Sequence, residues 1–109
     1  MQANQVKQEL PKIQEQISEA ERICEYSDSA SEELKEVLSE LSNRSSAAQQ
    51  LLEEEEDEQR IVEYVDELEE LSDRAMKACR ESSDSLDLGL QHAVRTAHKS
   101  LSDLKHQLH

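Results

Sequence analysis

The stretch that decides the fold is SAAQQLLEEEEDEQRIVEYVDELEELSDRAMKACRE, which runs from Ser46 to Glu81. It contains no Gly or Pro and few β-branched residues, so its intrinsic propensities favour one unbroken helix. Its apolar residues recur at steps of three and four from Ile61 to Ala78, which places them in one stripe along that helix. No apolar residue occurs from Glu53 to Gln59, so this part predicts helical turns surrounded by solvent.

The composition of the whole chain is typical of a coiled-coil bundle. The 109 residues include one Gly, one Pro, two Tyr, and no Phe or Trp. An α/β domain usually relies on aromatic packing, whereas an aliphatic chain rich in Glu, Gln and Lys is typical of long packed helices. We therefore expect a single all-α domain that spans residues 1–109.

A second apolar seam runs from Val6 to Leu41, also at alternating steps of three and four. Polar segments interrupt the pattern and are candidates for turns. They are YSDSASEE at residues 26–33, SNRSS at residues 42–46 and SSDS at residues 82–85. In the first segment Asp28 or Ser29 could cap a new helix, because Ser29 and Glu32 have the spacing of a capping box.

The architecture that these turns favour is an antiparallel three-helix bundle with coiled-coil-like packing. Its turn at 43–45 gives helices at about 5–42, 46–81 and 84–108. In this fold Ile13 pairs with Ala75, and two polar segments of the first two helices lie opposite each other.

An alternative architecture places the first turn at 27–30 and continues one long helix over 31–81. Two helical hairpins then share that helix, and neither has a full core, so this fold requires a dimer. The two SDS turns, each a few residues after a Cys, hint at an internal duplication of about 55 residues. Both architectures contain the same last hairpin.

In the three-helix fold the first two helices project beyond the third as a leucine-rich tip. Two helices cannot bury that much apolar surface, and an uncovered apolar patch of this kind marks an interaction site. We expect the tip to bind a second copy of the chain or an amphipathic helix of a partner protein. The residues predicted to bind the partner are Leu34, Val37, Leu38, Leu41, Leu51 and Leu52.

We predict no catalytic site, no cofactor and no metal site. With one Gly, the chain has no phosphate-binding loop, and it has no nucleophile elbow. Cys24 and Cys79 lie on the apolar stripes, where a free Cys behaves as a small hydrophobic residue. His106 and His109 are spaced to share a metal with Asp103, but we interpret them as a solvated helix end.

The formal net charge of −14 argues against direct binding to nucleic acid. It is unevenly placed, because residues 1–88 carry 25 acidic and 9 basic side chains, whereas the remainder carries one and three. The last helix is therefore expected to pack against acidic ones. No apolar run is long enough to span a membrane, and two distant cysteines form no disulfide framework, so we expect a cytoplasmic protein in a reducing compartment.

These observations predict a non-enzymatic protein–protein interaction module of the adaptor or scaffold type. It would self-associate or dock a partner's amphipathic helix, as a homo-oligomer or a hetero-complex. One alternative is a small acidic chaperone of the secretion type, which shields an amphipathic segment. Another is an acidic mimic of nucleic acid, whose Glu53–Glu70 face would block a DNA-binding protein.

Overall fold

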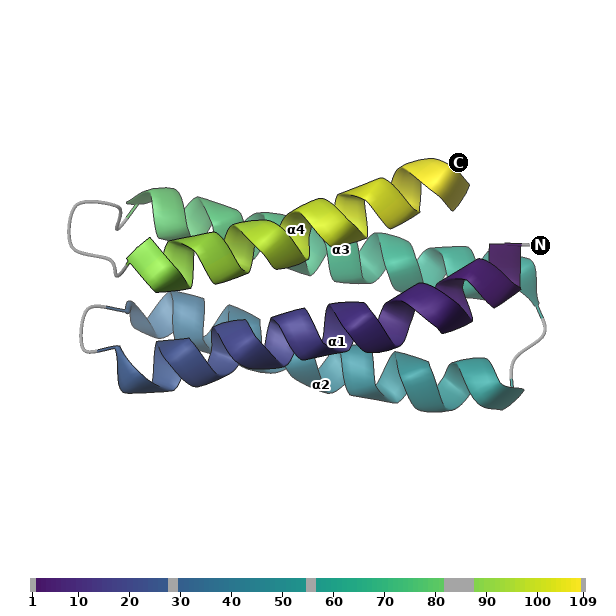
Figure 1. Cartoon of the computed structure of the whole chain (residues 1–109), viewed down its shortest axis with the longest axis horizontal. Helices are drawn as coiled ribbons and strands as arrows, with labels where there is room; N and C mark the ends of the chain where they lie inside the picture. Colours follow the sequence, from purple (N-terminus) through teal and green to yellow (C-terminus); the bar gives the residue numbers. More distant parts are fainter. Residues whose placement is uncertain (1, 28–29, 55–56, 82–87, 109) are drawn as a thin grey trace.

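The chain folds into helices that run up and down in sequence order (Figure 1). The computed structural model describes residues 2–27, 30–54, 57–81 and 88–108. Its helices are α1 (Gln2–Tyr26), α2 (Glu32–Glu54), α3 (Glu58–Glu81) and α4 (Leu88–Leu108). The bundle measures 43 × 22 × 18 Å, and both termini lie at the end where α2 passes into α3 (Figure 1).

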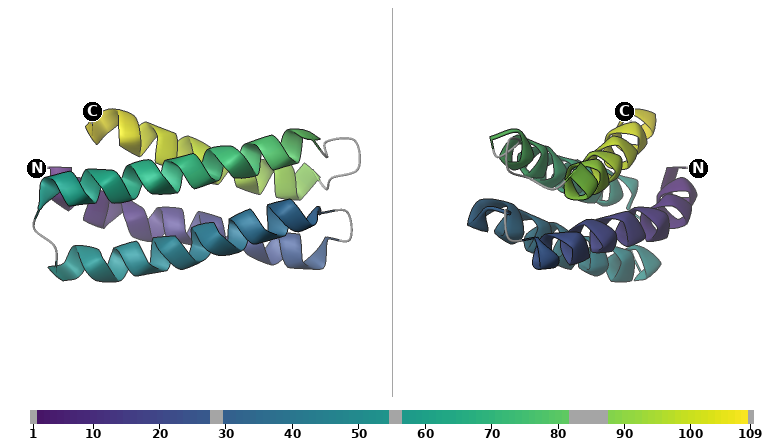
Figure 2. Two further views of the ribbon diagram at one scale, coloured as in Figure 1. Left: turned by 180° about the vertical axis from the view of Figure 1, so that it is seen from behind. Right: turned by 60° about the vertical axis from the view of Figure 1, so that its left-hand side comes forward.

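The four helices form two hairpins that pack against each other. Helix α1 packs against α2 and α4, and helix α3 also packs against α2 and α4. Helices α1 and α3 run in the same direction and meet across the centre of the bundle (Figure 2). This arrangement is an up-down-up-down four-helix bundle with short connections.

The all-α prediction is confirmed, but the prediction of three helices is wrong. The expected turn at 43–45 does not form, because α2 continues through it from Glu32 to Glu54. Ser and Asn are weak helix formers, and they lower the intrinsic helix propensity of this segment. Burial outweighs that cost, since Leu41, Ser45, Ala48 and Leu52 all face the core on one stripe of α2.

The helices predicted at 5–42 and 46–81 are therefore each divided in two. The antiparallel pairing of Ile13 with Ala75 is also wrong, because α1 and α3 run parallel to each other. The alternative architecture placed the first turn correctly, between Tyr26 and Glu32. Its long helix over 31–81 is wrong, and the last hairpin that both architectures share is present as α3 and α4.

The break between α2 and α3 falls inside the acidic segment that was expected to stay helical. Glu favours a helix, but a segment without apolar residues gains nothing from tertiary packing, so a turn there costs little. Asp57 caps the new helix. The Gln59 N–H donates a hydrogen bond to Asp57 Oδ1 at 3.0 Å, and the Ile61 N–H donates to the Asp57 carbonyl at 3.2 Å.

Ser31 caps α2 in the same way. The Leu34 N–H donates a hydrogen bond to Ser31 Oγ, and the Lys35 N–H donates to the Ser31 carbonyl, both at 3.1 Å. Ser31 therefore satisfies two of the N–H groups that a helix start leaves without an intrahelical partner. Asp28 and Ser29, which the sequence suggested as caps, lie outside the described residues.

Helix α1 contains the single Pro of the chain at its exposed position 11. The helix continues on both sides of Pro11, although Pro removes one helical hydrogen bond and its ring crowds the preceding turn. Val6 and Leu10, five residues before it and directly before it, are both fully buried. Their packing holds the helix together where the backbone is weakest.

The core is continuous along the bundle and almost entirely aliphatic. It contains Val6, Leu10, Ile13, Ile17, Ala20 and Cys24 of α1; Leu34, Val37, Leu38, Leu41, Ala48 and Leu52 of α2; Ile61, Val65, Leu68, Leu71, Ala75, Ala78 and Cys79 of α3; and Leu90, Val94, Ala97, Leu101, Leu104 and Leu108 of α4. One chain thus buries its own apolar seams, and the dimer that the alternative architecture required is not needed for a core.

Candidate functional site

The ionisable side chains between α3 and α4 form a structural network. His98 Nε2 lies 3.7 Å from a carboxylate oxygen of Glu69 and 3.7 Å from one of Asp73, and Lys105 Nζ lies 3.4 Å from Glu69. These contacts join the helix with an excess of basic residues to an acidic neighbour. Such partly exposed pairs orient helices more than they stabilise them.

Within the described residues, no three His, Cys, Asp or Glu side chains gather around a common metal position. His106 Nδ1 lies 2.8 Å from the Ser102 carbonyl in its own helix, and His109 falls outside the described residues. Burial raises the pKa of Cys24 and raises that of Cys79 to about 11, so neither thiol is activated as a nucleophile at neutral pH.

The structure separates the six residues predicted to bind a partner into two groups. Five of them are buried in the bundle's own core: Leu34, Val37, Leu38, Leu41 and Leu52. Helices α1 and α3 both pack along α2 and cover these residues. Leu51 differs, because 45% of its surface is exposed. It is the member of the set that a partner can reach without unfolding the bundle.

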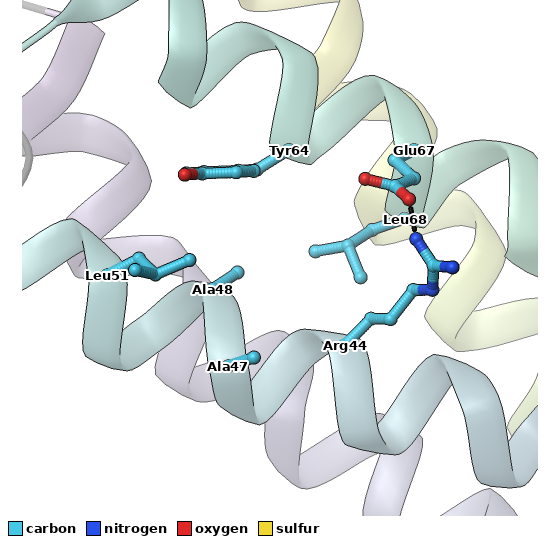
Figure 3. Close-up of a pocket in the computed structure, with 7 residues that line it drawn as sticks. All are labelled: Arg44, Ala47, Ala48, Leu51, Tyr64, Glu67 and Leu68. Atoms are coloured by element: carbon cyan, nitrogen blue, oxygen red, sulfur yellow. Dashed lines mark ion pairs between the residues drawn. The ribbon is translucent and has the colours of Figure 1, made fainter.

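Leu51 lies at the edge of a pocket on the seam between α2 and α3 (Figure 3). The pocket has a volume of about 150 Å³ and a predominantly apolar lining. Helix α2 contributes Arg44, Ala47, Ala48 and Leu51, and helix α3 contributes Tyr64, Glu67 and Leu68. The small side chains of Ala47 and Ala48 lie opposite Tyr64 and Leu68, so the two helices leave a space that larger residues would fill.

An ion pair closes one end of this pocket. The Arg44 guanidinium pairs with the Glu67 carboxylate across the seam, as Figure 3 shows, and Arg44 Nε lies 3.2 Å from Glu40 Oε1 on its own helix. Beyond Arg44 lies a polar hollow of about 160 Å³, lined by Glu40, Glu67 and Glu70 together with Arg74. The apolar pocket therefore adjoins a surface with three carboxylates and two guanidinium groups.

The helix ends beyond the pocket are also acidic. Glu53 and Glu54 end α2, Asp57 caps α3, Glu58 begins it, and all four are exposed. Helix α2 carries six acidic and two basic side chains, and α3 carries eight and four, whereas α4 carries one and three. The face built by α2 and α3 is therefore the strongly negative face of the bundle, and it favours a positively charged ligand.

A second, larger hollow lies on the opposite seam, between α1 and α4. Its volume is about 440 Å³, and Ile23, Gly89 and Ala93 supply its apolar surface. Its rim combines Lys12 with Glu15 and Glu19, so it favours neither a positively nor a negatively charged partner. The α2–α3 pocket is the better-defined candidate, because its apolar lining and its negative surroundings both favour a ligand that combines an apolar group with positive charge.

The pocket residues Arg44, Ala47 and Tyr64 were not predicted from the sequence. Ala47 and Tyr64 become neighbours only because the chain turns between α2 and α3, and the sequence predicted helix there. The available signal was a pair of alanines before Leu51, followed after a wholly polar segment by the second of two tyrosines. Recognising that polar segment as a turn would have placed these residues together.

No protein-family model, curated protein or solved structure matches this chain. No described helix combines the length and the apolar content that a membrane span requires. The class that the fold defines is an up-down-up-down four-helix bundle, and its α2–α3 face carries the candidate site.

Proposed function

We propose that this protein is a non-enzymatic interaction module of the adaptor type, which docks a basic amphipathic helix of another protein on its α2–α3 face. One observation carries the proposal: an exposed leucine, Leu51, borders an apolar pocket between α2 and α3, the two helices with the largest excess of carboxylates among those described. A helix that offers an apolar side chain between Lys or Arg residues matches that arrangement.

The size of the pocket supports a single anchoring side chain. An apolar cavity of about 150 Å³ accommodates benzene, so a pocket of that volume suits one aromatic or branched aliphatic side chain. Tyr64 offers a flat, partly buried ring as one wall, which costs little conformational entropy on binding. Side chains seated in such pockets at the centre of an interface supply most of its binding energy.

The acidic surroundings contribute to the rate and the selectivity of binding. Negative potential over the α2–α3 face accelerates encounter with a basic segment and repels acidic competitors. Pairs at the rim add little affinity because they remain hydrated. We therefore expect affinity to depend mainly on the apolar anchor, and the association rate to depend mainly on salt.

Of the two alternative functions, the chaperone is compatible with this site and the nucleic-acid mimic is not. A small chaperone that shields a basic amphipathic segment would use the same face, and it is a special case of the proposal. A nucleic-acid mimic needs carboxylates in a regular row along the Glu53–Glu70 face. We do not propose it, because the turn between Glu54 and Glu58 divides that row between two antiparallel helices.

The two tyrosines allow a matched test. The probe is a synthetic amphipathic peptide of Leu, Lys and Ala, labelled with a fluorophore, and its affinity is measured by fluorescence anisotropy. Tyr64→Ala removes one wall of the pocket, and we expect it to weaken binding at least about tenfold. Tyr26→Ala removes an exposed tyrosine at the other end of the bundle and should leave the affinity unchanged.

The same peptide distinguishes the pocket from the charge around it. Raising the salt concentration should slow association and leave a measurable affinity, because an apolar anchor is not screened. Equal binding by both tyrosine variants, with both folded by circular dichroism, would show that the pocket is not the site. Complete loss of binding in salt would assign recognition to the acidic surface alone.

A further inference from the structure

The hollow between α1 and α4 lies on a seam that joins the two hairpins. Its volume of about 440 Å³ falls within the range of small-molecule sites in proteins, which is about 300–1,000 Å³. The α2–α3 pocket lies on the opposite seam of the bundle and shares no lining residue with the hollow. A ligand in the hollow would therefore leave the α2–α3 face accessible.

The hollow is built by two helices whose register is fixed. Helices α1 and α4 pack against each other and run in opposite directions (Figure 1). Near the ends of the chain, the Gln5 side-chain amide donates a hydrogen bond to Gln107 Oε1 across the seam. The same antiparallel register places Gln16 of α1 level with Thr96 of α4, and both residues line the hollow. Its walls are therefore set by helix packing, which holds a site more precisely than a loop does.

Small residues of α4 leave the space open. Gly89 and Ala93 lie one turn apart on the wall that α4 contributes, and Ile23 of α1 lies level with Gly89. Ile23 and Ala93 are partly buried and pack against the core, so the floor of the hollow is apolar. Larger side chains at positions 89 and 93 would fill the space, as they do along the other parts of the core.

Gln16 contributes an unpaired hydrogen-bond acceptor beside this apolar floor. Its Oε1 is shielded from solvent and accepts no hydrogen bond from the described residues. Thr96 lies at the same level, but its hydroxyl donates to the His92 carbonyl of its own helix at 2.9 Å. The last side-chain torsion of Gln is soft, so the oxygen can turn toward the hollow. A ligand donor that meets it there adds a hydrogen bond and breaks none.

The charges on the rim compensate each other. Lys12 and Glu15 are neighbours on one face of α1, three residues apart. Glu19 pairs with Arg22 on the same helix. A charged ligand would thus lose hydration in the hollow without gaining a partner of opposite charge, whereas a neutral ligand avoids that cost.

We propose that the α1–α4 hollow binds a neutral small molecule that has an aromatic or alicyclic body and one hydroxyl or N–H donor. The body lies against Ile23 and Ala93 in the space beside Gly89, and the donor binds Gln16 Oε1. Because the ligand contacts one helix of each hairpin, it binds the folded chain and not the unfolded one. It therefore raises the stability of the bundle as its concentration rises above the dissociation constant.

The test uses two small probes and the full-length protein. Indole is a neutral bicyclic aromatic molecule with one N–H donor, and benzofuran has nearly the same size and shape but no donor. Each is titrated into isotope-labelled protein, and the shifts of the backbone amide signals give the dissociation constant and the position of the ligand. We expect indole to shift signals of α1 and α4 around the hollow and to raise the melting temperature. Benzofuran should bind there about tenfold more weakly.

Variants separate the space from the acceptor. Ala93→Leu fills the hollow and should abolish indole binding, whereas Ala47→Leu changes the α2–α3 pocket and should leave indole binding unchanged. Gln16→Met keeps the length of the side chain and removes the acceptor, so it should bind both probes equally. Should Ala93→Leu fail to fold by circular dichroism, Gly89→Leu replaces it.

Three results would overturn the proposal. The first is an indole titration that shifts no amide signals around the hollow. The second is unchanged indole binding by a folded variant in which the hollow is filled. The third is equal affinity of the unmodified protein for indole and benzofuran, because it would mean that the Gln16 oxygen receives no hydrogen bond from the ligand.

Discussion

Truncation of Leu34 and of Leu51 provides a direct test of the four-helix core. The two residues lie in the same helix, and the sequence assigned both to one partner-binding set. In the structure Leu34 has an exposed fraction of 0%, whereas Leu51 has 45%. The substitution Leu→Ala is chemically identical at the two positions and changes the intrinsic helix propensity little. Any difference in stability therefore reports tertiary burial.

The expected magnitudes follow from these exposed fractions. Leu34→Ala loses the transfer free energy of a fully buried side chain, about 2 kcal/mol, and leaves a cavity, for a total of about 3 kcal/mol or more. Leu51→Ala loses about half the transfer term and leaves no closed cavity, so we expect about 1 kcal/mol or less. Against a total stability of about 5–15 kcal/mol, the first change is large and the second is small.

Urea denaturation followed by far-UV circular dichroism measures both values. The slope of the free energy with urea should stay constant, so that the change in midpoint reports stability alone. Equal losses at the two positions would refute the reasoning, because they would mean that Leu34 is not enclosed between α1 and α3. In the peptide assay the order reverses, and Leu51→Ala should weaken binding more than Leu34→Ala does.

Three further predictions concern the core and the backbone. The Ser45 hydroxyl is fully buried and has no hydrogen-bond partner among the described residues, so Ser45→Ala should raise the free energy of unfolding by about 1 kcal/mol in urea denaturation. Pro11→Ala restores a helical hydrogen bond in α1 and should stabilise the protein by up to about 3 kcal/mol, visible as a higher melting temperature. Burial raises the pKa of Cys79 from 9.0 to about 11, so the folded state holds this proton more tightly than the unfolded chain. That contribution is complete below pH 9 and is lost, by about 2 kcal/mol, between pH 9 and pH 11, a loss that Cys79→Ala should not show in urea denaturation across this range.

The turns show why the sequence could predict the helices better than their connections. At residues 42–46 the weak helix formers suggested a turn, yet Ser45 continues the buried stripe of α2. At residues 53–58 the strong helix formers suggested a helix, yet nothing there can pack against a neighbour. In both places burial of the surrounding seam outweighed local propensity, because one buried leucine is worth several residues of propensity difference.

The candidate site was predicted only in part for the same reason. Leu51 was named from the sequence because two helices alone could not bury the leucines around it. The other five leucine and valine positions proved to be core, since α1 and α3 both pack along α2. Tyr64 and Arg44 could not be assigned to the pocket until the position of the turn between α2 and α3 was known.

The amino-acid sequence by itself determined that this chain is helical, that its apolar seams are aliphatic, and that its last two helices form a hairpin. Those properties reside in the three- and four-residue spacing of side chains along one helix, which is a local quantity. The tertiary structure alone decided the number of helices, the parallel diagonal of α1 and α3, and the pocket between α2 and α3. Each depends on which helix surfaces bury each other across the bundle. The free energy of that burial comes from contacts between helices, and the spacing of residues along one helix does not show which helices will be in contact.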